Sequence, residues 1–233
     1  MSYISQMKET VLDNPAWGAL TSVHAHFAQG TDRAKRYAPG IVPFVAIGDT
    51  ASDSLKELDP WMNPGETFYI IGDLPTLPQG WVVEHELPCA QMVLGSSMPP
   101  MMDDENVTVS LLGEADATDM FNLINSLQPG YYNKDTRLLG SYYGIRQEGM
   151  LVAMAGERMR FSGYTELSAI CTHKDYTGRG YAQRLINRLC QQHAAAGITS
   201  CLHVSLANER AIRIYAHMGF EQRREIIFRR VRK

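Results

Sequence analysis

The residues best suited to chemistry surround two glycines, Gly178 and Gly180, which follow an apolar stretch ending at Thr172 and precede an amphipathic stretch beginning at Tyr181. Glycine lets the backbone adopt conformations that other residues avoid and lets a ligand approach closely. The first turn of a helix also leaves backbone N–H groups unpaired, and these attract anions. A strand, a glycine turn and a helix in this order predict a site for a phosphorylated cofactor.

Two familiar phosphate-binding motifs do not fit this turn. A nucleotide P-loop requires Gly-Lys-Ser or Gly-Lys-Thr, which the chain lacks. A dinucleotide fingerprint requires a third glycine three residues after Gly180, where the chain has Gln183. A Gly-x-Gly turn alone is a weak signal, and the interpretation that remains is a pyrophosphate held by backbone amides.

A second candidate site lies on the segment from Asn208 to Gly219. Asn208 is a favourable helix N-cap, and Tyr215 follows it by seven residues. Seven residues make about two turns, so the two side chains share one helix face roughly 10 Å apart along the axis. An amide at the cap and a phenol two turns later could contact an extended ligand at two points.

The spacing of apolar residues predicts the elements that position these motifs. Residues 182–193 place one apolar and one polar face on a helix, which Gly197 is expected to end. In the second half, strands are expected at 107–112, 142–146, 150–159, 166–172, 198–206 and 221–231, and helices at 115–126, 182–193 and 208–219. The predicted fold class is mixed α/β.

The first half of the chain shows a similar mixture of elements without a glycine turn of this kind. Asn14 and Pro15 are typical of a helix N-terminus, and helical spacing continues to Phe27. Strands are expected at 41–47, 68–71 and 81–83, with a short helix at 52–58. The segment 97–106 combines two prolines with three acids, and it predicts a boundary between an α/β domain, residues 1–105, and a second domain, residues 106–233.

The composition of the 233 residues is that of a globular protein, with 45% hydrophobic residues and a net charge of −3. No apolar run reaches the roughly 18 residues of a membrane span, and the first ten residues lack the features of a signal peptide. A cytoplasmic location without a membrane partner is therefore expected. The four cysteines show no paired spacing and are expected to be reduced. Six basic residues at 223–233 are interpreted as the polar face of a terminal strand, in preference to a nucleic-acid site.

At the glycine turn and the Asn208 segment the chain resembles the GNAT superfamily of acyl-CoA N-acyltransferases, over residues 107–233. The family's Q/R-x-x-G-x-G/A element has its two glycines at Gly178 and Gly180, whereas Asp175 replaces glutamine or arginine and Thr177 stands where arginine is common. The resemblance implies a mixed, mostly antiparallel sheet with a splayed parallel strand pair and flanking helices. It also implies acetyl-CoA or coenzyme A as co-substrate, and no metal.

The same resemblance implies roles for individual residues. The splayed strand would hold the pantetheine arm through its backbone, Asn208 would contact the arm, and Tyr215 would donate a proton to the departing thiolate. A backbone N–H near Cys171 would hold the developing oxyanion. The implied cofactor-binding residues are Ile170, Cys171, Thr172, Thr177, Gly178, Arg179, Gly180, Tyr181, Ala182, Asn208 and Tyr215.

A general base is expected because an amine is protonated at neutral pH and must lose a proton before or during attack. Glu166 lies at the start of the cofactor strand, where similar enzymes often carry a glutamate, so it is the candidate base. The alternative is a solvated carboxylate at a strand end, and His203 is a second candidate. A thiol mechanism with Cys171 and His173 is disfavoured, because the family transfers acyl groups directly.

The loop that contains Tyr132 and Arg137 falls where the family builds its acceptor site. Both are candidate substrate residues, and the Arg137 guanidinium could pair with a substrate carboxylate. The alternative for Arg137 is a solvated surface residue. The acceptor is therefore expected to be a small-molecule amine or an amino-acid-like compound.

These features predict an enzyme that transfers an acetyl or other small acyl group from acyl-CoA to a primary amine by direct attack in a ternary complex. The alternative is a non-catalytic module that binds or senses acyl-CoA, which the missing basic side chains at Asp175 and Thr177 would suit. Residues 1–105 are interpreted as a degenerate second GNAT-like unit, similar to the tandem arrangement of glycine N-acyltransferases. One cofactor site per chain is then expected, and a homodimer is left open.

Overall fold

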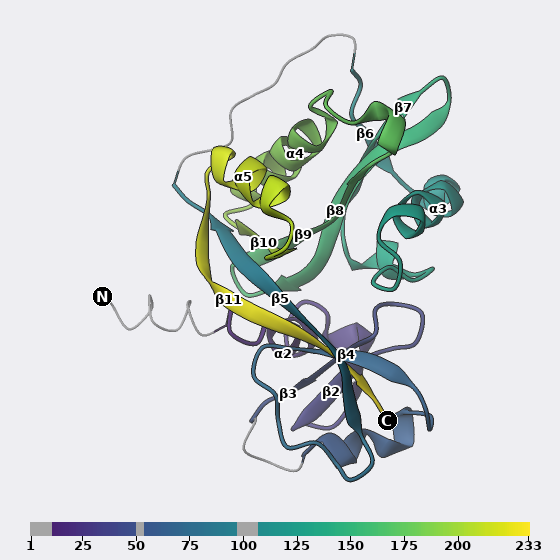
Figure 1. The fold of residues 1–233 in the computed structure, drawn as a ribbon, viewed down its shortest axis with the longest axis vertical. Coiled ribbons are helices and arrows are strands. Elements are labelled where there is room, and N and C mark those ends of the chain that lie inside the picture. The colour runs from purple at the N-terminus through teal and green to yellow at the C-terminus, as the bar shows by residue number, and fades with distance from the viewer. Residues whose placement is uncertain (1–10, 50–53, 97–106) are drawn as a thin grey trace.

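The computed structural model describes residues 11–49, 54–96 and 107–233, whose arrangement Figure 1 shows. The strands of this part of the chain form one eleven-stranded sheet in the order β1-β2-β3-β4-β11-β5-β10-β9-β8-β7-β6. β10 runs parallel to β9 and β3 runs parallel to β4, whereas the other described neighbours are antiparallel. The sheet is mixed and mostly antiparallel with flanking helices, which confirms the predicted fold class.

The C-terminal half contains the elements that the sequence predicts after residue 107. Its strands are β6 (Ser110–Leu112), β7 (Tyr142–Gln147), β8 (Met150–Phe161), β9 (Tyr164–Thr172), β10 (Thr199–Ser205) and β11 (Phe220–Arg232). Its α-helices are α3 (Ala117–Leu127), α4 (Tyr181–Ala195) and α5 (Glu209–His217), with short 3₁₀ helices η3 (Glu114–Asp116), η4 (Thr136–Leu139) and η5 (Lys174–Tyr176). α4 packs on one face of β8 and α3 on the other (Figure 1), so this half has three layers.

The N-terminal half is smaller and has fewer helical residues. It contains α2 (Pro15–Leu20), β1 (Ala28–Gly30), β2 (Ala34–Tyr37), β3 (Phe44–Ile47) and β4 (Thr67–Ile71), with 3₁₀ helices η1 (Ala25–Phe27) and η2 (Ser54–Trp61). Asn14 caps α2 as predicted, because its side-chain oxygen accepts the Trp17 N–H at 3.3 Å. The helix ends at Leu20, before the predicted end at Phe27. The Thr21 hydroxyl bonds back to the Trp17 carbonyl, and a turn and η1 follow.

Two long strands, β5 (Val82–Leu94) and β11, lie side by side and run through both halves (Figure 1). The sequence predicts only residues 81–83 of β5, because Pro88 and a run of polar residues obscure the strand pattern. Those polar residues face the basic cluster of β11: the Arg229 Nε donates to Glu86 at 2.6 Å. The basic cluster thus lies on the terminal strand β11, where arginines pair with acids of β5.

The predicted domain boundary at residues 97–106 lies outside the described residues. β5, which precedes it, pairs with β10 of the C-terminal half, and β11 pairs with β4 of the N-terminal half. The sheet is therefore continuous from one half to the other. The division into domains at residues 1–105 and 106–233 stays a prediction.

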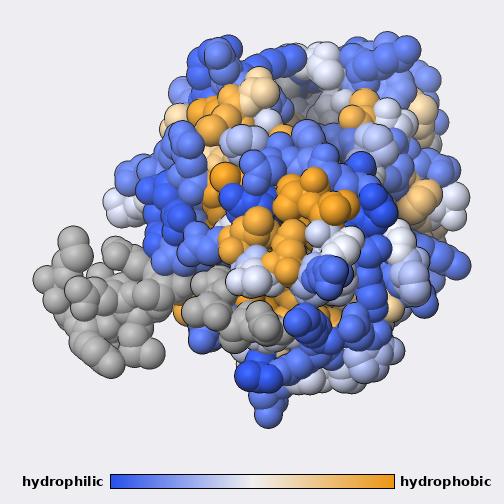
Figure 2. Space-filling view, turned by 60° about the horizontal axis from the view of Figure 1, so that its bottom comes forward, coloured by the Kyte–Doolittle hydropathy of each residue, from blue (hydrophilic) through white to orange (hydrophobic). Residues whose placement is uncertain are grey.

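The surface is mostly hydrophilic with some apolar areas, as Figure 2 shows for one face. Among the described residues of the N-terminal half, the large apolar side chains that stay exposed are Val23, Trp61, Leu74, Val82 and Val83. None of the helices in the described ranges has both the length and the apolar character that crossing a membrane requires.

Candidate active site

The parallel strands β9 and β10 separate in the middle of the C-terminal half. Residues 164–167 pair with residues 199–202, and the register ends there. Just beyond this point β9 has a bulge, in which Ala169 and Ile170 stand opposite Ala155 alone. Ala169 has φ of 50°, which is unusual for a residue with a side chain. Because a bulge bends its strand, β9 turns away from β10 as the family resemblance implies.

A groove of about 510 Å³ lies beside the end of β9 and between α4 and α5. The eleven predicted cofactor-binding residues all line it: Ile170, Cys171, Thr172, Thr177, Gly178, Arg179, Gly180, Tyr181, Ala182, Asn208 and Tyr215. These residues come from one strand end, one turn and two helices. The structure therefore brings together two motifs that lie about 30 residues apart in the sequence.

The glycine turn adopts a conformation that requires its glycines. Gly178 has φ of 80° and Gly180 has φ of 74°, both in the left-handed region. A Cβ built on Gly178 meets nothing within 4 Å, so the space above this residue is open. The Thr177 hydroxyl donates to the Lys174 carbonyl at 3.1 Å and thereby closes η5, whereas Asp175 does not line the groove. The residues that depart from the family motif thus sit in or before the turn, and residues 177–182 line the groove.

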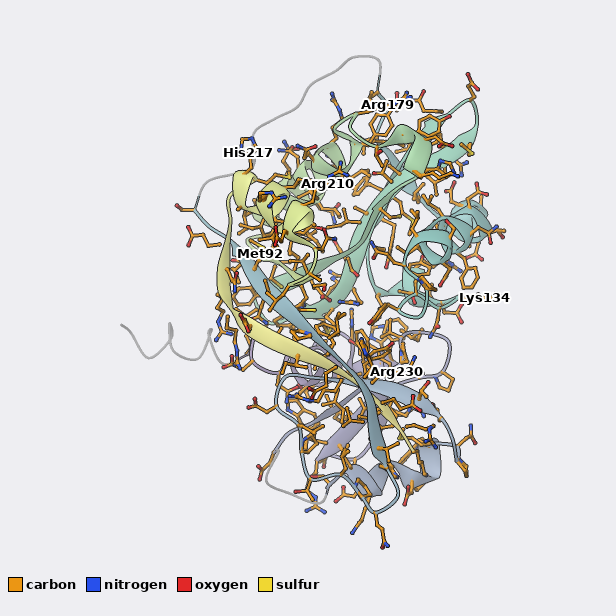
Figure 3. All side chains as sticks on the ribbon, in the orientation of Figure 1. Met92, Lys134, Arg179, Arg210, His217 and Arg230 are labelled. Atoms are coloured by element: carbon orange, nitrogen blue, oxygen red, sulfur yellow. The ribbon has the colours of Figure 1, made fainter. Side chains whose placement is uncertain are left out.

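Two arginines add positive charge to the groove. Arg179 lies in the turn with its guanidinium 4.8 Å from the centre of the Tyr176 ring, and Arg210 lies in the first turn of α5. Both line the groove, and Figure 3 shows both in the upper part of the C-terminal half. Positive charge and helix N-termini at one surface suit a phosphorylated ligand.

Helix α5 carries the second motif as predicted. The Asn208 side-chain oxygen accepts the Ala211 N–H at 3.1 Å and caps the helix, and Tyr215 lies two turns later. Burial raises the pKa of Tyr215 to about 12. The phenol is therefore protonated at neutral pH and can donate a proton.

A second cavity, of about 320 Å³, adjoins the groove. Both are lined by Gln128, Ile170, Asn208 and Tyr215, so they meet at the open end of the strand pair. Aliphatic and aromatic side chains form much of the second cavity, and they come from both halves of the molecule: Leu87 and Cys89 lie on β5 and Phe228 lies on β11. The phenol side chain of Tyr215 lines this junction. A chemical group could pass there from the groove to the cavity.

Glu166, the candidate base, lies beneath the second cavity and does not line it. It is fully buried and accepts hydrogen bonds from Arg158 Nε at 2.9 Å and Nη2 at 2.6 Å. Burial acts to raise the pKa of this carboxyl, but Arg158 and His203 outweigh it and lower the pKa to about 2. Glu166 is therefore ionised at neutral pH and holds the guanidinium of Arg158, which does line the cavity.

His203, the second candidate base, is held in one tautomer. Its Nδ1 lies 2.7 Å from Glu166 Oε1, and its Nε2 lies 3.0 Å from Gln91 Nε2. Gln91 must present its NH₂ group to the histidine, because its oxygen accepts from Arg223 at 2.8 Å. His203 therefore accepts at Nε2 and donates from Nδ1 to Glu166. Both ring nitrogens are engaged within the protein.

The two predicted substrate residues lie in different surroundings. Tyr132 is buried and lines the second cavity, and its hydroxyl has no hydrogen-bond partner among the described residues. Arg137 lies on η4, forms an ion pair with Glu114, and lines neither the groove nor the cavity. The structure thus brings Tyr132 to the site and does not bring Arg137 there.

Thiol chemistry finds little support at this site. Cys171 is buried, and burial raises the pKa of its thiol to about 12, so it is a thiol at neutral pH. Within the described ranges, no group of three His, Cys, Asp or Glu side chains is arranged to hold a metal ion.

Sequence reasoning missed three residues at the site: Arg158, Arg210 and Gln128. Arg158 lies within a strand that is otherwise almost entirely buried, and a charged residue in such a strand is a signal that could have singled it out. Arg210 is the second residue of α5 and lies within the predicted segment from Asn208 to Gly219. Gln128 follows α3 directly, and nothing in its sequence surroundings marks it as a site residue.

Comparisons with known proteins agree with this geometry. Residues 142–229 match the FR47-like protein family model. A crystal structure from Novosphingobium aromaticivorans, assigned to the GNAT acetyltransferase family, has 31% sequence identity and a TM-score of 0.84, covering 94% of this chain and 97% of that one. A search of curated proteins finds no match.

Two more distant structures share the fold. A GCN5-related N-acetyltransferase from Kribbella flavida has 13% identity and a TM-score of 0.64, covering 95% of this chain and 94% of that one. A GCN5-related N-acetyltransferase-like protein from Streptococcus suis has 13% identity and a TM-score of 0.55, covering 98% of this chain and all of that one. The fold and the two-motif groove define an acyltransferase of the GNAT type. The chain belongs to the GNAT family.

Proposed function

We propose that this protein transfers an acetyl or other small acyl group from acyl-CoA to a primary amine, by direct attack in a ternary complex. The observation that carries the proposal is the junction at Ile170 and Tyr215, where a groove lined by both cofactor motifs opens into a separate cavity. A two-substrate transfer needs two such compartments that meet at one point.

The groove fits coenzyme A in its chemistry. The amides of the turn and the first turn of α4, with Arg179, would bind the pyrophosphate, and the backbone of residues 170–172 with Asn208 would bind the pantetheine arm. The open space above Gly178 leaves room for a phosphate against the backbone. When bound, acetyl-CoA supplies a thioester whose acyl carbon can accept an amine.

Tyr215 would act as general acid toward the leaving sulfur, because its raised pKa keeps it protonated and it lies where the two compartments meet. A backbone N–H near Cys171 would hold the oxyanion. Glu166 as a direct proton acceptor stays a prediction. Its burial and its low pKa suit a positioning role through Arg158 and His203, with the acceptor attacking as the free base.

The test is release of free thiol from acetyl-CoA with a panel of primary amines, alongside calorimetry of coenzyme A binding. The proposal expects amine-dependent thiol release and a matching acetylated product by mass spectrometry. Tight coenzyme A binding without turnover on any amine would instead favour a non-catalytic acyl-CoA-binding module.

A further inference from the structure

The guanidinium of Arg158 presents an unused edge to the second cavity. An arginine carries five N–H donors, and the Nε and one Nη2 donor of Arg158 bond to Glu166. None of the described residues accepts the other three, although only 8% of Arg158 is exposed and the residue lines the cavity. A buried guanidinium edge without acceptors is costly unless a ligand supplies them.

The surroundings of Arg158 fix this edge in place. The Arg158 Cζ lies 5.0 Å from the centre of the Phe44 ring and 5.6 Å from the centre of the Phe228 ring. Glu166 holds the neighbouring edge, formed by Nε and Nη2, and it is fully buried outside the cavity lining. Two hydrogen bonds and two aromatic rings therefore leave the arginine little freedom to turn away from the cavity.

We propose that the acceptor is an amine that also carries a carboxylate, bound by the free edge of Arg158. This proposal rests on the proposed function and names the substrate class for the same site. The Nη1 and remaining Nη2 donors lie side by side, which suits the two oxygens of a carboxylate. An acceptor that enters as a zwitterion brings no net charge into the buried cavity.

The test compares pairs of amines that differ only in the carboxylate. Glycine, β-alanine and 4-aminobutyrate are each assayed against the corresponding amide, with kcat/KM expressed per free-base amine. We expect at least one carboxylate to exceed its amide by about 10- to 100-fold, the range for hydrogen bonds to a charged group. Equal rates within every pair, a preference for the amides, or a stronger preference for 2-aminoethylphosphonate would overturn the proposal.

The double variant Arg158→Gln with Glu166→Gln removes both charges together and so avoids an unpaired buried ion. It should bring the carboxylate-to-amide ratio of kcat/KM close to one, and calorimetry of the carboxylates against their amides should show the same loss of selectivity independently of turnover. Arg160→Gln is the control, because Arg160 lies on the same strand with a half-exposed side chain outside the cavity. If Arg160→Gln loses the preference for carboxylates, or if the double variant keeps it, Arg158 does not bind the carboxylate.

A binding measurement separates this proposal from the proposed function. Calorimetry of 4-aminobutyrate, β-alanine and glycine against their amides is carried out on the full chain saturated with coenzyme A. Carboxylate-selective binding without turnover would reject the transfer activity and keep the carboxylate site. Turnover of amides and carboxylates alike, with no selective binding, would reject the carboxylate site and keep the activity.

Discussion

The two halves of the molecule share one strand arrangement, but the groove lined by the predicted cofactor residues lies in the C-terminal half. In the C-terminal half β7, β8 and β9 form an antiparallel run, and β9 lies parallel to β10. In the N-terminal half β1, β2 and β3 form such a run, and β3 lies parallel to β4. Each parallel pair is flanked by the last strand of the other half, since β5 pairs with β10 and β11 pairs with β4. We propose that the N-terminal half is a degenerate GNAT-like unit that exchanges its final strand with the C-terminal one.

The difference between the halves lies in what surrounds each parallel pair. Beside β9 and β10 the chain provides α4 and α5 and leaves a groove, whereas residues 72–81 between β4 and β5 form no helix. At the ends of β3 and β4 there is a cavity of only about 80 Å³, and the Asn14 side chain donates to the Ile47 carbonyl there at 2.8 Å. An open strand pair becomes a ligand site only when helices supply donors and nothing in the chain fills the space.

The N-terminal half still contributes to the second cavity. Its β5 supplies Leu87 and Cys89 to the lining, and the Phe44 ring of β3 has its centre 5.0 Å from the Arg158 Cζ. Tyr69 of β4 packs against Tyr131, another lining residue, with ring centres 4.9 Å apart. The half without a cofactor groove therefore closes the cavity of the half that has one.

The largest effect is expected from Tyr215→Phe, which removes the proposed general acid of the C-terminal half. We expect kcat to fall by roughly 100-fold or more with little change in the KM for acetyl-CoA, because the ring still packs against the groove. Tyr37→Phe removes a buried phenol of the N-terminal half that bonds to His24. It should lower stability and leave kcat unchanged, as measured by thiol release and thermal unfolding. Comparable losses of kcat in both variants would remove the functional distinction between the halves.

The next effect concerns stability in acid. The pKa of Glu166 is lowered to about 2, so its ion pair stabilises the fold above about pH 4.5 and this contribution is lost as pH falls toward 2. The free energy of unfolding should fall on the order of 3 kcal/mol across this range from this group alone. The double variant Arg158→Gln with Glu166→Gln should flatten the profile. Replacing Arg36 and Glu66, the more exposed pair of the N-terminal half, should change it less.

A smaller effect on cofactor binding is expected from the glycine turn. Gly178 and Gly65 have φ of 80° and 77°, and neither has an atom within 4 Å of a built Cβ, so valine strains both backbones alike. Only Gly178 lines the groove. Gly178→Val should raise the KM for acetyl-CoA about 10-fold or more, whereas Gly65→Val in the N-terminal half should only lower the melting temperature. An unchanged KM in Gly178→Val would place the pyrophosphate elsewhere.

The smallest effect is expected from the two asparagine caps. Asn208→Ala and Asn14→Ala each remove an N-cap hydrogen bond, which costs about 1 kcal/mol of stability. Asn208 also lines the groove and the cavity, so its variant should raise the KM for acetyl-CoA several-fold as well. Chemical denaturation and steady-state kinetics on both variants measure the two effects. A higher KM for acetyl-CoA in Asn14→Ala would show that the parallel pair β3 and β4 of the N-terminal half affects cofactor binding.

Local sequence signals predicted the residues that line the groove well and those that line the second cavity poorly. Gly178, Gly180, Asn208 and Tyr215 belong to short motifs whose spacing fixes their geometry, and the structure places them in one groove. The cavity depends on contacts between distant strands, such as Arg158 with Phe44 and Phe228, which no local pattern records.

The fold shows the same contrast between local patterns and contacts of distant strands. Long periodic elements such as α4 were predicted within a few residues. Most of β5 was missed, because its polar residues are stabilised by β11 from the other end of the chain. Glu166 and Arg137 were chosen by position along the chain, and the structure shows that burial and ion pairs decide which charged groups reach a cavity.

The central claim is that the open strand pair of the C-terminal half is the single coenzyme A site. Calorimetric titration of the full chain with coenzyme A tests it most directly. We expect one equivalent per chain, with binding weakened by Gly178→Val and preserved in Gly65→Val. Two equivalents per chain, or one equivalent that Gly178→Val leaves intact, would contradict the claim.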